Sequence, residues 1–247
     1  MPDRIAVISD VHGNLTALEA VLADIDARDI TRIVNLGDLV GKGPRGSETI
    51  ALTRKRCEVT VRGNWDTFIA GPQDLPFESG RWVRNELTDD DRDWLGALPN
   101  IHEVVISGEH VRLLHASPVS EFHRVLSHHT PAEFTGMFAN TGFTGAGPTP
   151  TIVGYGDIHD TYLEVDDGRT LFNAGSVGNH LDAPSAPYVV IEGEVDSTTP
   201  APFGISFVRV PYDIEREIHV ARELGMPDVE AYALELREGI YRKRSTG

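Results

Sequence analysis

Cysteine is almost absent from this sequence, and long apolar runs are absent altogether. The single cysteine, Cys57, excludes a disulfide within the 247 residues and agrees with a reducing compartment. The first residues, MPDRIAVISDVHG, lack the charged and apolar regions of a secretion signal, and no apolar run is long enough to span a bilayer. We therefore expect a cytoplasmic protein that has no membrane partner.

Positive charge is scarce as well. The chain has 22 Lys and Arg residues against 38 Asp and Glu residues, which gives a formal net charge of −16. This charge opposes binding to long nucleic acids, because phosphate backbones are bound by clustered cations. The 40% hydrophobic content is ordinary for a folded protein, and no linker or repeat divides the chain. We expect a single domain over residues 1–247.

The first part of the chain alternates short β-branched runs with helical patterns. Residues 4–9 predict a strand, and Asn14 can cap the helix that the apolar spacing after it indicates. The pattern continues with a strand at 31–36, a helix at 48–57 and a strand at 58–61. Such alternation favours a largely parallel sheet.

The second half is richer in β structure. Residues 77–98 predict two helices, and the segment after Thr130 predicts another one, because Pro131 and Glu133 follow a threonine cap. Short runs between turn signals predict strands at residues 101–107, 111–114, 151–153, 161–165, 169–173, 188–193 and 205–210. Residues 213–247 form a tail with two helical patterns.

Polar residues that bind metals follow five of the predicted strands. In open α/β sheets, ligand sites lie at the carboxyl ends of the strands. A single polar residue or pair of this kind is common in turns, but an ordered set of them across five loops is not. Carboxylate, amide and imidazole groups together suit divalent transition metals such as Mn, Fe, Co or Zn. The residues concerned are Asp10, His12, Asp38, Asn64, His115, Asp157 and His159.

These motifs resemble those of the calcineurin-like metallophosphoesterase superfamily, in particular its small bacterial and archaeal phosphoesterases with a DVHGN-type first motif. The similarity is carried by Asp10-Val11-His12-Gly13-Asn14, Gly37-Asp38, Gly63-Asn64-Trp65-Asp66, His115-Ala116-Ser117-Pro118, Gly156-Asp157-Ile158-His159 and Asn173-Ala174-Gly175-Ser176-Val177-Gly178. The resemblance implies an α/β (α+β) fold, a four-layer αββα sandwich with a small helical insertion.

The resemblance also implies two divalent transition metals, with Mn or Fe expected and Zn, Co or Ni as alternatives. Asp10, His12 and His159 would hold one metal, and Asn64, His115 and Asp157 the other. Asp38 would bridge them. A metal-activated water would attack the phosphorus, because two metals clamp a phosphoryl group and lower the pKa of bound water.

Asp157 departs from the family pattern, which usually has histidine at this position. Two divalent ions with three carboxylates, Asp10, Asp38 and Asp157, would leave about +1 at the centre instead of +2, which lowers its Lewis acidity. We hypothesise that Asp157 retunes the second metal site or leaves it weakly occupied. The alternative is that Asp157 turns away and caps its loop.

Trp65 is the second departure, since many relatives have a histidine here that is thought to protonate the leaving group. An indole N–H does not titrate near neutral pH. We expect better hydrolysis of aryl esters or phosphoanhydrides than of alkyl monoesters. Trp65 could instead stack on a base or pack in the core.

Other residues receive more limited predictions. Asp66 is expected to cap or orient the turn after Asn64, or to support a metal ligand. His180 follows the Asn173 to Gly178 turn closely enough to support the site. Lys42 and Arg45 lie on the loop after Asp38, where a cation could bind phosphate; a solvated loop is the alternative.

The sequence therefore predicts a metal-dependent phosphoesterase, a hydrolase for a small phosphodiester or nucleotide polyphosphate. A serine/threonine protein phosphatase and a degenerate, non-catalytic member that binds a metal or nucleotide are the alternatives. Residues 71–100 and 116–150 are candidate cap or dimerisation segments, so a homo-oligomer stays open.

Overall fold

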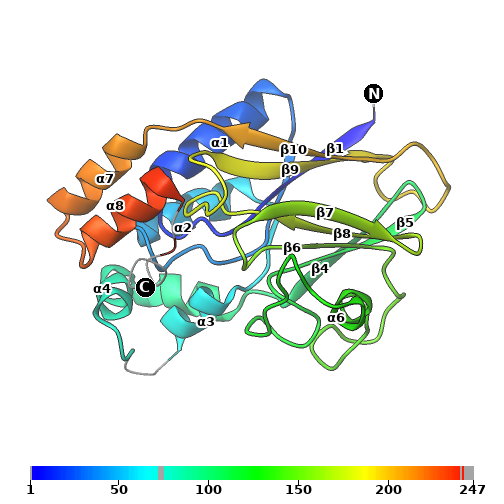
Figure 1. Ribbon diagram of the computed structural model, residues 1–247, viewed down its shortest axis with the longest axis horizontal. Helices are drawn as coiled ribbons and strands as arrows, with labels where there is room; N and C mark the ends of the chain where they lie inside the picture. The colour runs from blue at the N-terminus through cyan, green and yellow to red at the C-terminus, as the bar shows by residue number, and fades with distance from the viewer. Residues whose placement is uncertain (1, 72–74, 240, 242–247) are drawn as a thin grey trace.

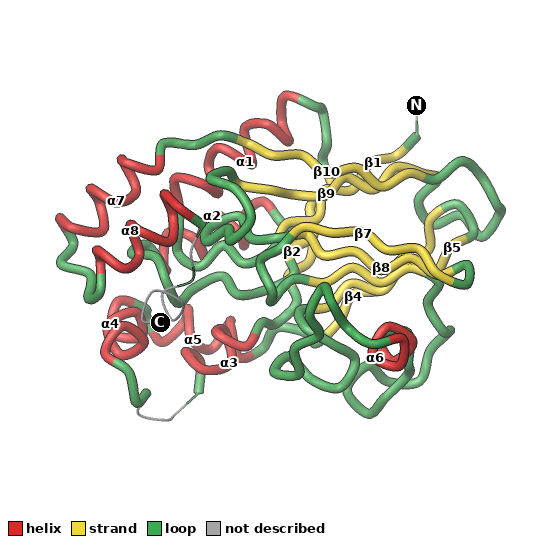
Figure 2. The backbone as a smooth tube through the Cα atoms, viewed as in Figure 1, coloured by secondary structure: helices red, strands yellow, loops and turns green. Residues whose placement is uncertain are grey.

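Two five-stranded sheets form the centre of the fold in a computed structural model that describes residues 2–71, 75–239 and 241 (Figures 1 and 2). The first sheet has the order β10-β9-β1-β2-β3, and the second has the order β4-β5-β6-β8-β7. The strands of the first sheet are β1 (Asp3–Ile8), β2 (Arg32–Asn35), β3 (Val59–Thr60), β9 (Ala186–Gly193) and β10 (Gly204–Val210). Those of the second are β4 (Ile101–Ile106), β5 (Glu109–Leu114), β6 (Ile152–Tyr155), β7 (Thr161–Asp166) and β8 (Arg169–Ala174).

The parallel pairing predicted from the first part of the chain is confirmed for β1, β2 and β3, but both sheets are mixed because further strands join them antiparallel. The strands β1, β2 and β3 run parallel, as do β5, β6 and β8. The strands β9, β10, β4 and β7 pair antiparallel to their neighbours. Tight turns such as Asp167-Gly168 join neighbouring strands as hairpins, which can only be antiparallel. Each sheet thus has three parallel strands, and their carboxyl ends carry the candidate site.

Alternation along β1 shows how the two sheets share a core. Ile5 and Val7 face the second sheet and pack against residues of β5 such as Val111. Ala6 and Ile8 point the other way, toward the helices. Successive side chains of a strand alternate between its faces, so one apolar strand covers two layers.

Helices cover the outer face of the first sheet. They are α1 (Leu15–Ala27), α2 (Gly46–Arg56), α7 (Ile214–Glu223) and α8 (Val229–Glu238). Asn14 caps α1 as predicted, since its side chain accepts a hydrogen bond from the Ala17 amide. The second sheet is covered by the short helix α6 (Pro131–Gly136) and by the loop before it (Figure 1). The layers are those of the expected αββα sandwich, with one outer layer formed mostly by loop.

The helical insertion packs on the same side as α1 and α2. It contains the two predicted helices, α4 (Glu78–Glu86) and α5 (Asp89–Gly96), and Val83 and Leu95 join the core beneath the helix layer. The preceding helix, α3 (Asn64–Ala70), was not predicted. Residues 72–74 of the insertion, and 240 and 242–247 of the predicted tail, lie outside the described residues. Among the described helices, none has the length and apolarity needed to span a membrane.

Candidate metal centre

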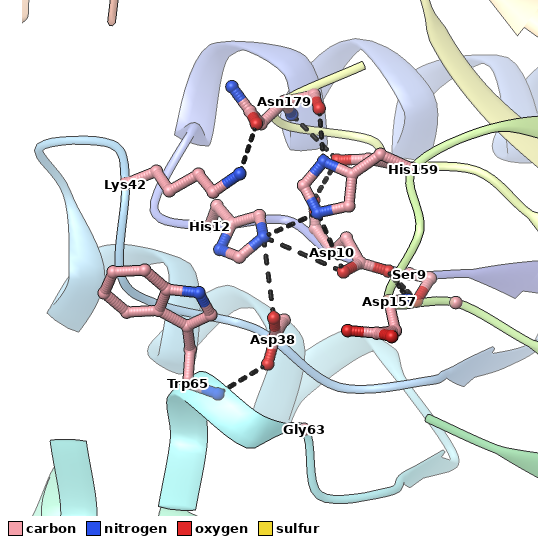
Figure 3. A network of polar contacts seen from close by, with 12 residues as sticks. Ser9, Asp10, His12, Asp38, Lys42, Gly63, Trp65, Asp157, His159 and Asn179 are labelled. Atoms are coloured by element: carbon pink, nitrogen blue, oxygen red, sulfur yellow. Dashed lines mark hydrogen bonds and ion pairs between the residues drawn. The ribbon is translucent and has the colours of Figure 1, made fainter. Parts of the chain in front are cut away.

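The candidate ligands meet at the carboxyl ends of the parallel strands (Figure 3). Two sets of ligand atoms each lie within 4.8 Å of one another. One set comes from Asp10, His12 and His159, and the other from Asp10, Asp38 and His115. The four side chains of Asp10, His12, Asp38 and His159 point toward one another in Figure 3. Loops from both sheets are therefore needed to form the centre.

The three histidines are oriented by the protein backbone. Each ring places Nδ1 against a carbonyl oxygen, so in the neutral ring Nδ1 carries the proton and Nε2 offers a lone pair. In His12 and His159 the two Nε2 atoms are 3.1 Å apart. The carbonyl groups belong to Val40 for His12, Leu36 for His115 and Asn179 for His159.

Buried polar atoms without partners show that these residues fit a cation. Among the described residues, Asn64 Oδ1 accepts no hydrogen bond, and neither Asp10 Oδ1 nor His115 Nε2 has a regular hydrogen bond. His159 Nε2 lies 3.2 Å from Asp10 Oδ1, and Asp38 Oδ1 lies 3.4 Å from His115 Nε2. Buried polar groups are rarely left unpaired, because each costs about 1–3 kcal/mol. Two lone-pair nitrogens 3.1 Å apart likewise require a positive charge between them. The donor set of oxygen and imidazole nitrogen suits divalent transition metals.

The backbone at the ligands is strained. Asp10, His12, Asp38, Asp157 and His159 have φ angles of 53°, 50°, 54°, 64° and 65°, in the left-handed region that non-glycine residues seldom adopt. Such conformations cost roughly 1–3 kcal/mol each and cluster at functional sites. The fold therefore holds these side chains in positions that the isolated loops would not prefer.

The electrostatics also favour a cation at the centre. Burial opposes protonation of His115, but the carboxylates of Asp38, Asp10 and Asp157 outweigh burial and raise its pKa to about 9. Burial raises the pKa of Asp38 well above its usual range. Asp38 and His115 thus both hold protons more readily than usual, because they are buried beside other carboxylates.

The Asp157 carboxylate lies against a guanidinium that was not assigned to it from the sequence. Arg124 donates from Nε to Asp157 Oδ2 at 2.8 Å and from Nη2 to Oδ1 at 2.7 Å. Asn64 Nδ2 also donates to Asp157 Oδ1, at 3.2 Å, and His115 Nε2 lies 4.0 Å from that oxygen. The carboxylate accepts only from side chains of the described residues, which does not support its alternative role as a loop cap. Arg124 restores the positive charge that Asp157 removes.

Asp66 is fully buried and supports the loop that carries Asp38. Its Oδ2 accepts from the backbone N–H of Asp38 and of Gly63, both at 2.9 Å, and its Oδ1 accepts from that of Leu39 at 2.9 Å. Asp66 is the third residue of α3, so the same carboxylate caps this helix. The capping role and the supporting role predicted for it are therefore one arrangement.

A cavity of about 310 Å³ opens beside the centre. Cationic side chains face it from two sides, Lys42 from the loop after β2 and Arg124 from the loop after β5. Trp65 and Tyr241 supply aromatic surface, and Asp38, Asp157 and His159 lie at its base. Its volume is at the lower end of the range for small-molecule sites.

Comparison with known proteins identifies the family. The profile of the Calcineurin-like phosphoesterase superfamily domain matches residues 4–196. The chain belongs to this superfamily. This chain is 33% identical to an uncharacterised protein of Methanocaldococcus jannaschii over 225 residues, which cover 86% of this chain and 89% of that protein.

Solved structures of similar shape agree with the assignment. A metallophosphoesterase from Sphaerobacter thermophilus superposes on this superfamily member with a TM-score of 0.75 at 28% identity, covering 97% of this chain and 100% of that chain. A hypothetical protein from Pyrococcus horikoshii has a TM-score of 0.77 at 18% identity, covering 96% and 99%. The second likeness concerns the fold alone. Together with the clustered ligands, the family indicates a metal-dependent phosphoester hydrolase.

Trp65 of this superfamily member lies at the rim of the centre. Its ring meets His12 edge to face at a centroid distance of 6.0 Å and Phe77 at 5.5 Å. A Cβ atom at Gly41, whose φ is +131°, would come within 2.4 Å of the indole, so this glycine permits the indole's position. Trp65 thus packs partly in the core and still lines the cavity.

Lys42 and Arg45 have different surroundings. Lys42 lines the cavity, and its Nζ donates to Asn179 Oδ1 at 2.6 Å. Arg45 instead pairs with the buried Glu217 of α7 and donates to Thr16 Oγ1 at 2.6 Å. Its predicted contact with substrate phosphate is not supported, because its guanidinium is paired with Glu217 and Arg45 is not among the residues that line the cavity.

His180 also differs from the prediction that it supports a metal ligand. The ring is fully buried, and neither nitrogen has a hydrogen-bond partner among the described residues. Burial lowers its pKa to about 4. The residue before it, Asn179, takes the predicted supporting role, since its carbonyl accepts from His159 Nδ1. No pattern in the sequence marked Asn179, which lies 20 positions from its partner.

Proposed function

We propose that the protein hydrolyses a small phosphodiester or a nucleotide polyphosphate, using two divalent metal ions, Mn or Fe, in the cytoplasm. The observation that carries the proposal is the presence of two buried groups of ligand atoms that share Asp10, one completed by His12 and His159 and the other by Asp38 and His115. When bound, two metal ions would polarise the phosphoryl group and lower the pKa of a bound water, so that hydroxide attacks in line at neutral pH.

The chain's own residues would prepare this reaction. Asp10, His12 and His159 would hold one ion, Asn64, His115 and Asp157 the other, and Asp38 lies between the two sets. Asn64 would bind through Oδ1, the amide oxygen that has no partner in the described structure. The backbone carbonyl groups behind the histidines hold the proton of each neutral ring on Nδ1, so Nε2 is the nitrogen that faces the metal site.

Trp65 should affect which leaving groups the enzyme accepts, because it cannot act as a general acid. Its indole lines the cavity beside His12, but it cannot donate a proton at neutral pH. Substrates whose leaving group departs without a proton, such as aryl esters and phosphoanhydrides, should therefore react faster than alkyl esters. The cavity of about 310 Å³ suits a small molecule better than an extended chain.

A substrate panel tests the proposal. Protein of measured metal content, supplied with Mn, is assayed on an aryl phosphodiester, a nucleotide polyphosphate, matched aryl and alkyl monoesters, and a phosphopeptide. We expect turnover of the first two and a clear preference for aryl over alkyl esters. Equal aryl and alkyl rates would contradict the role given to Trp65. Preference for the phosphopeptide would favour a protein phosphatase, and metal binding without any turnover would favour a non-catalytic member.

A further inference from the structure

Arg124 and Asp157 meet in a paired contact that is more specific than neutralising the charge of Asp157 would require. The two side chains meet through a pair of nearly equal hydrogen bonds, 2.8 Å and 2.7 Å long. Paired bonds of this kind fix the plane of the guanidinium as well as its distance. The Asp157 side chain is 2% exposed, whereas that of Arg124 is 54% exposed. The carboxylate is therefore the fixed partner, and the guanidinium is the part that reaches solvent.

Within the described part of the chain, the Arg124 guanidinium still has N–H donors without a partner while it is bound to Asp157. An arginine has five N–H donors, and Asp157 occupies one on Nε and one on Nη2 in the main contact. Among the described residues, no hydrogen bond uses Nη1. Arg124 also lines the cavity beside the metal ligands. Its remaining donors are thus available to a ligand in that cavity.

The backbone at Arg124 is anchored. The next residue, Val125, is buried in the outer core of the second sheet, and its carbonyl accepts from the Tyr155 hydroxyl at 2.9 Å. The side chain is therefore presented from a fixed point, although the surrounding loop has neither helix nor strand. Arginine matches the oxygens of a phosphoryl group in the same planar manner as those of a carboxylate.

We propose that Arg124 is a phosphoryl-binding residue of this site and that Asp157 positions it. The inference rests on the proposed function and adds to it a reason for Asp157. The carboxylate supplies an oxygen to the metal centre and at the same time orients a cation toward the phosphoryl group. The positive charge of Arg124 offsets the negative charge of Asp157 and lies where the negatively charged phosphoryl group would bind.

Inorganic phosphate is the probe for this proposal. Its affinity for metal-loaded protein is measured by titration calorimetry, at equal metal content, for wild type and for Arg124→Gln. We expect Arg124→Gln to weaken phosphate binding on the order of 10 to 100-fold, because charge-assisted hydrogen bonds are lost. Arg124→Lys should recover part of the loss, since it keeps the charge without the planar pair of donors.

Two further variants separate positioning from neutralisation. Asp157→Asn should weaken phosphate binding less than Arg124→Gln does, and Arg124→Gln should cost less affinity in the Asp157→Asn background. If Arg124 serves only to neutralise Asp157, Arg124→Gln leaves phosphate affinity unchanged at equal metal content and raises metal affinity, because the uncompensated carboxylate attracts cations more strongly, and Asp157→Asn removes that effect. This second pattern overturns the proposal.

Arg32 and Glu58 provide the matched control. They form the same type of pair, with Nε to Oε2 and Nη2 to Oε1 both at 2.8 Å, at the other ends of β2 and β3. Arg32→Gln should leave phosphate affinity unchanged. Because the titration needs no turnover, a protein that hydrolyses nothing but loses phosphate binding with Arg124→Gln overturns the proposed function alone. Hydrolysis with phosphate binding that does not depend on Arg124 overturns this inference alone.

Discussion

The two ligand groups of the proposed metal centre are built differently. The first group, Asp10, His12 and His159, is buried, and the Nε2 atoms of its two imidazoles lie 3.1 Å apart. The second group, Asn64, His115 and Asp157, is already partly satisfied, because Asn64 and Arg124 donate to Asp157. The first group therefore needs a cation to stabilise its close Nε2 atoms, whereas the hydrogen bonds to Asp157 stabilise part of the second group without one. We expect the first group to bind its ion more tightly.

The largest effect is expected from His159→Gln, which removes one of the two facing imidazoles. Metal affinity of the first group should fall by more than the roughly 10 to 100-fold that changes around metal ligands cost, and hydrolysis should fall to near background. Metal analysis and phosphate release measure the two effects. The control is His219→Gln on α7, an exposed residue paired with Glu223. Unchanged metal content in His159→Gln would contradict the ligand assignment.

Metal titration of stripped protein tests the comparison directly. An ion at a hundred times its dissociation constant stabilises the folded state by about 2.7 kcal/mol. For a chain of this size that raises the Tm by about 5–10 °C. We expect two steps as Mn is added, the first at clearly lower concentration. A single step with two ions bound at the same concentration would show that the halves are equivalent.

Asp66→Asn should weaken both halves, because Asp66 holds the Asp38 loop that lies between them. An asparagine has one acceptor oxygen for three backbone N–H groups and turns an amide donor toward the rest. We expect metal affinity to fall about 10 to 100-fold and stability by about 1–3 kcal/mol.

Asp91→Asn is the control for Asp66→Asn. Asp91 occupies the same third position of a helix, α5, and caps it with Thr88. Its substitution should lower thermal stability and leave metal affinity unchanged. Equal metal affinity in both variants would mean that Asp66 is a helix cap only.

The smallest effect concerns the surroundings of the first group. His180 has its pKa lowered by burial from the ordinary 6.5 to about 4, so the unfolded chain takes up a proton between these values and the folded protein does not. Between pH 7.5 and 5 this uptake should cost the wild type about 2 kcal/mol of stability. His180→Phe should remove that part of the pH dependence, as measured by denaturant unfolding at both pH values. Identical pH dependence in both proteins would show that His180 titrates normally.

The sequence predicted what depends on local pattern. The strand at residues 4–9, the Asn14 cap and the Thr130 cap were all found close to their expected positions, since each depends on neighbours a few residues away. The family motifs identified the residues whose ligand atoms lie together in the structure, Asp10, His12, Asp38, His115 and His159. Helix α3 was missed because Asn64 was interpreted only as a ligand, although Gly63 and Asp66 are suitable for a helix start.

What could not be predicted depends on long-range contacts. The pairing of Arg124 with Asp157 joins loops of different strands, and the pairing of Arg45 with Glu217 joins the start of α2 to the C-terminal helices. A single sequence carries no signal for such pairs. The same holds for the antiparallel pairing of β9 with β1, which brings together opposite ends of the chain.

Asn179 has a consequence for the order in which this protein is completed. Its carbonyl accepts from His159, its Oδ1 accepts from Lys42, and its Nδ2 donates to the buried Glu235 of α8 at 2.9 Å. Domains are synthesised from the N-terminus, so the strands and most ligands leave the ribosome before α8 does. A nascent chain would therefore have its sheets before its finished ligand cluster, and docking of α8 would be the step that completes the proposed metal site.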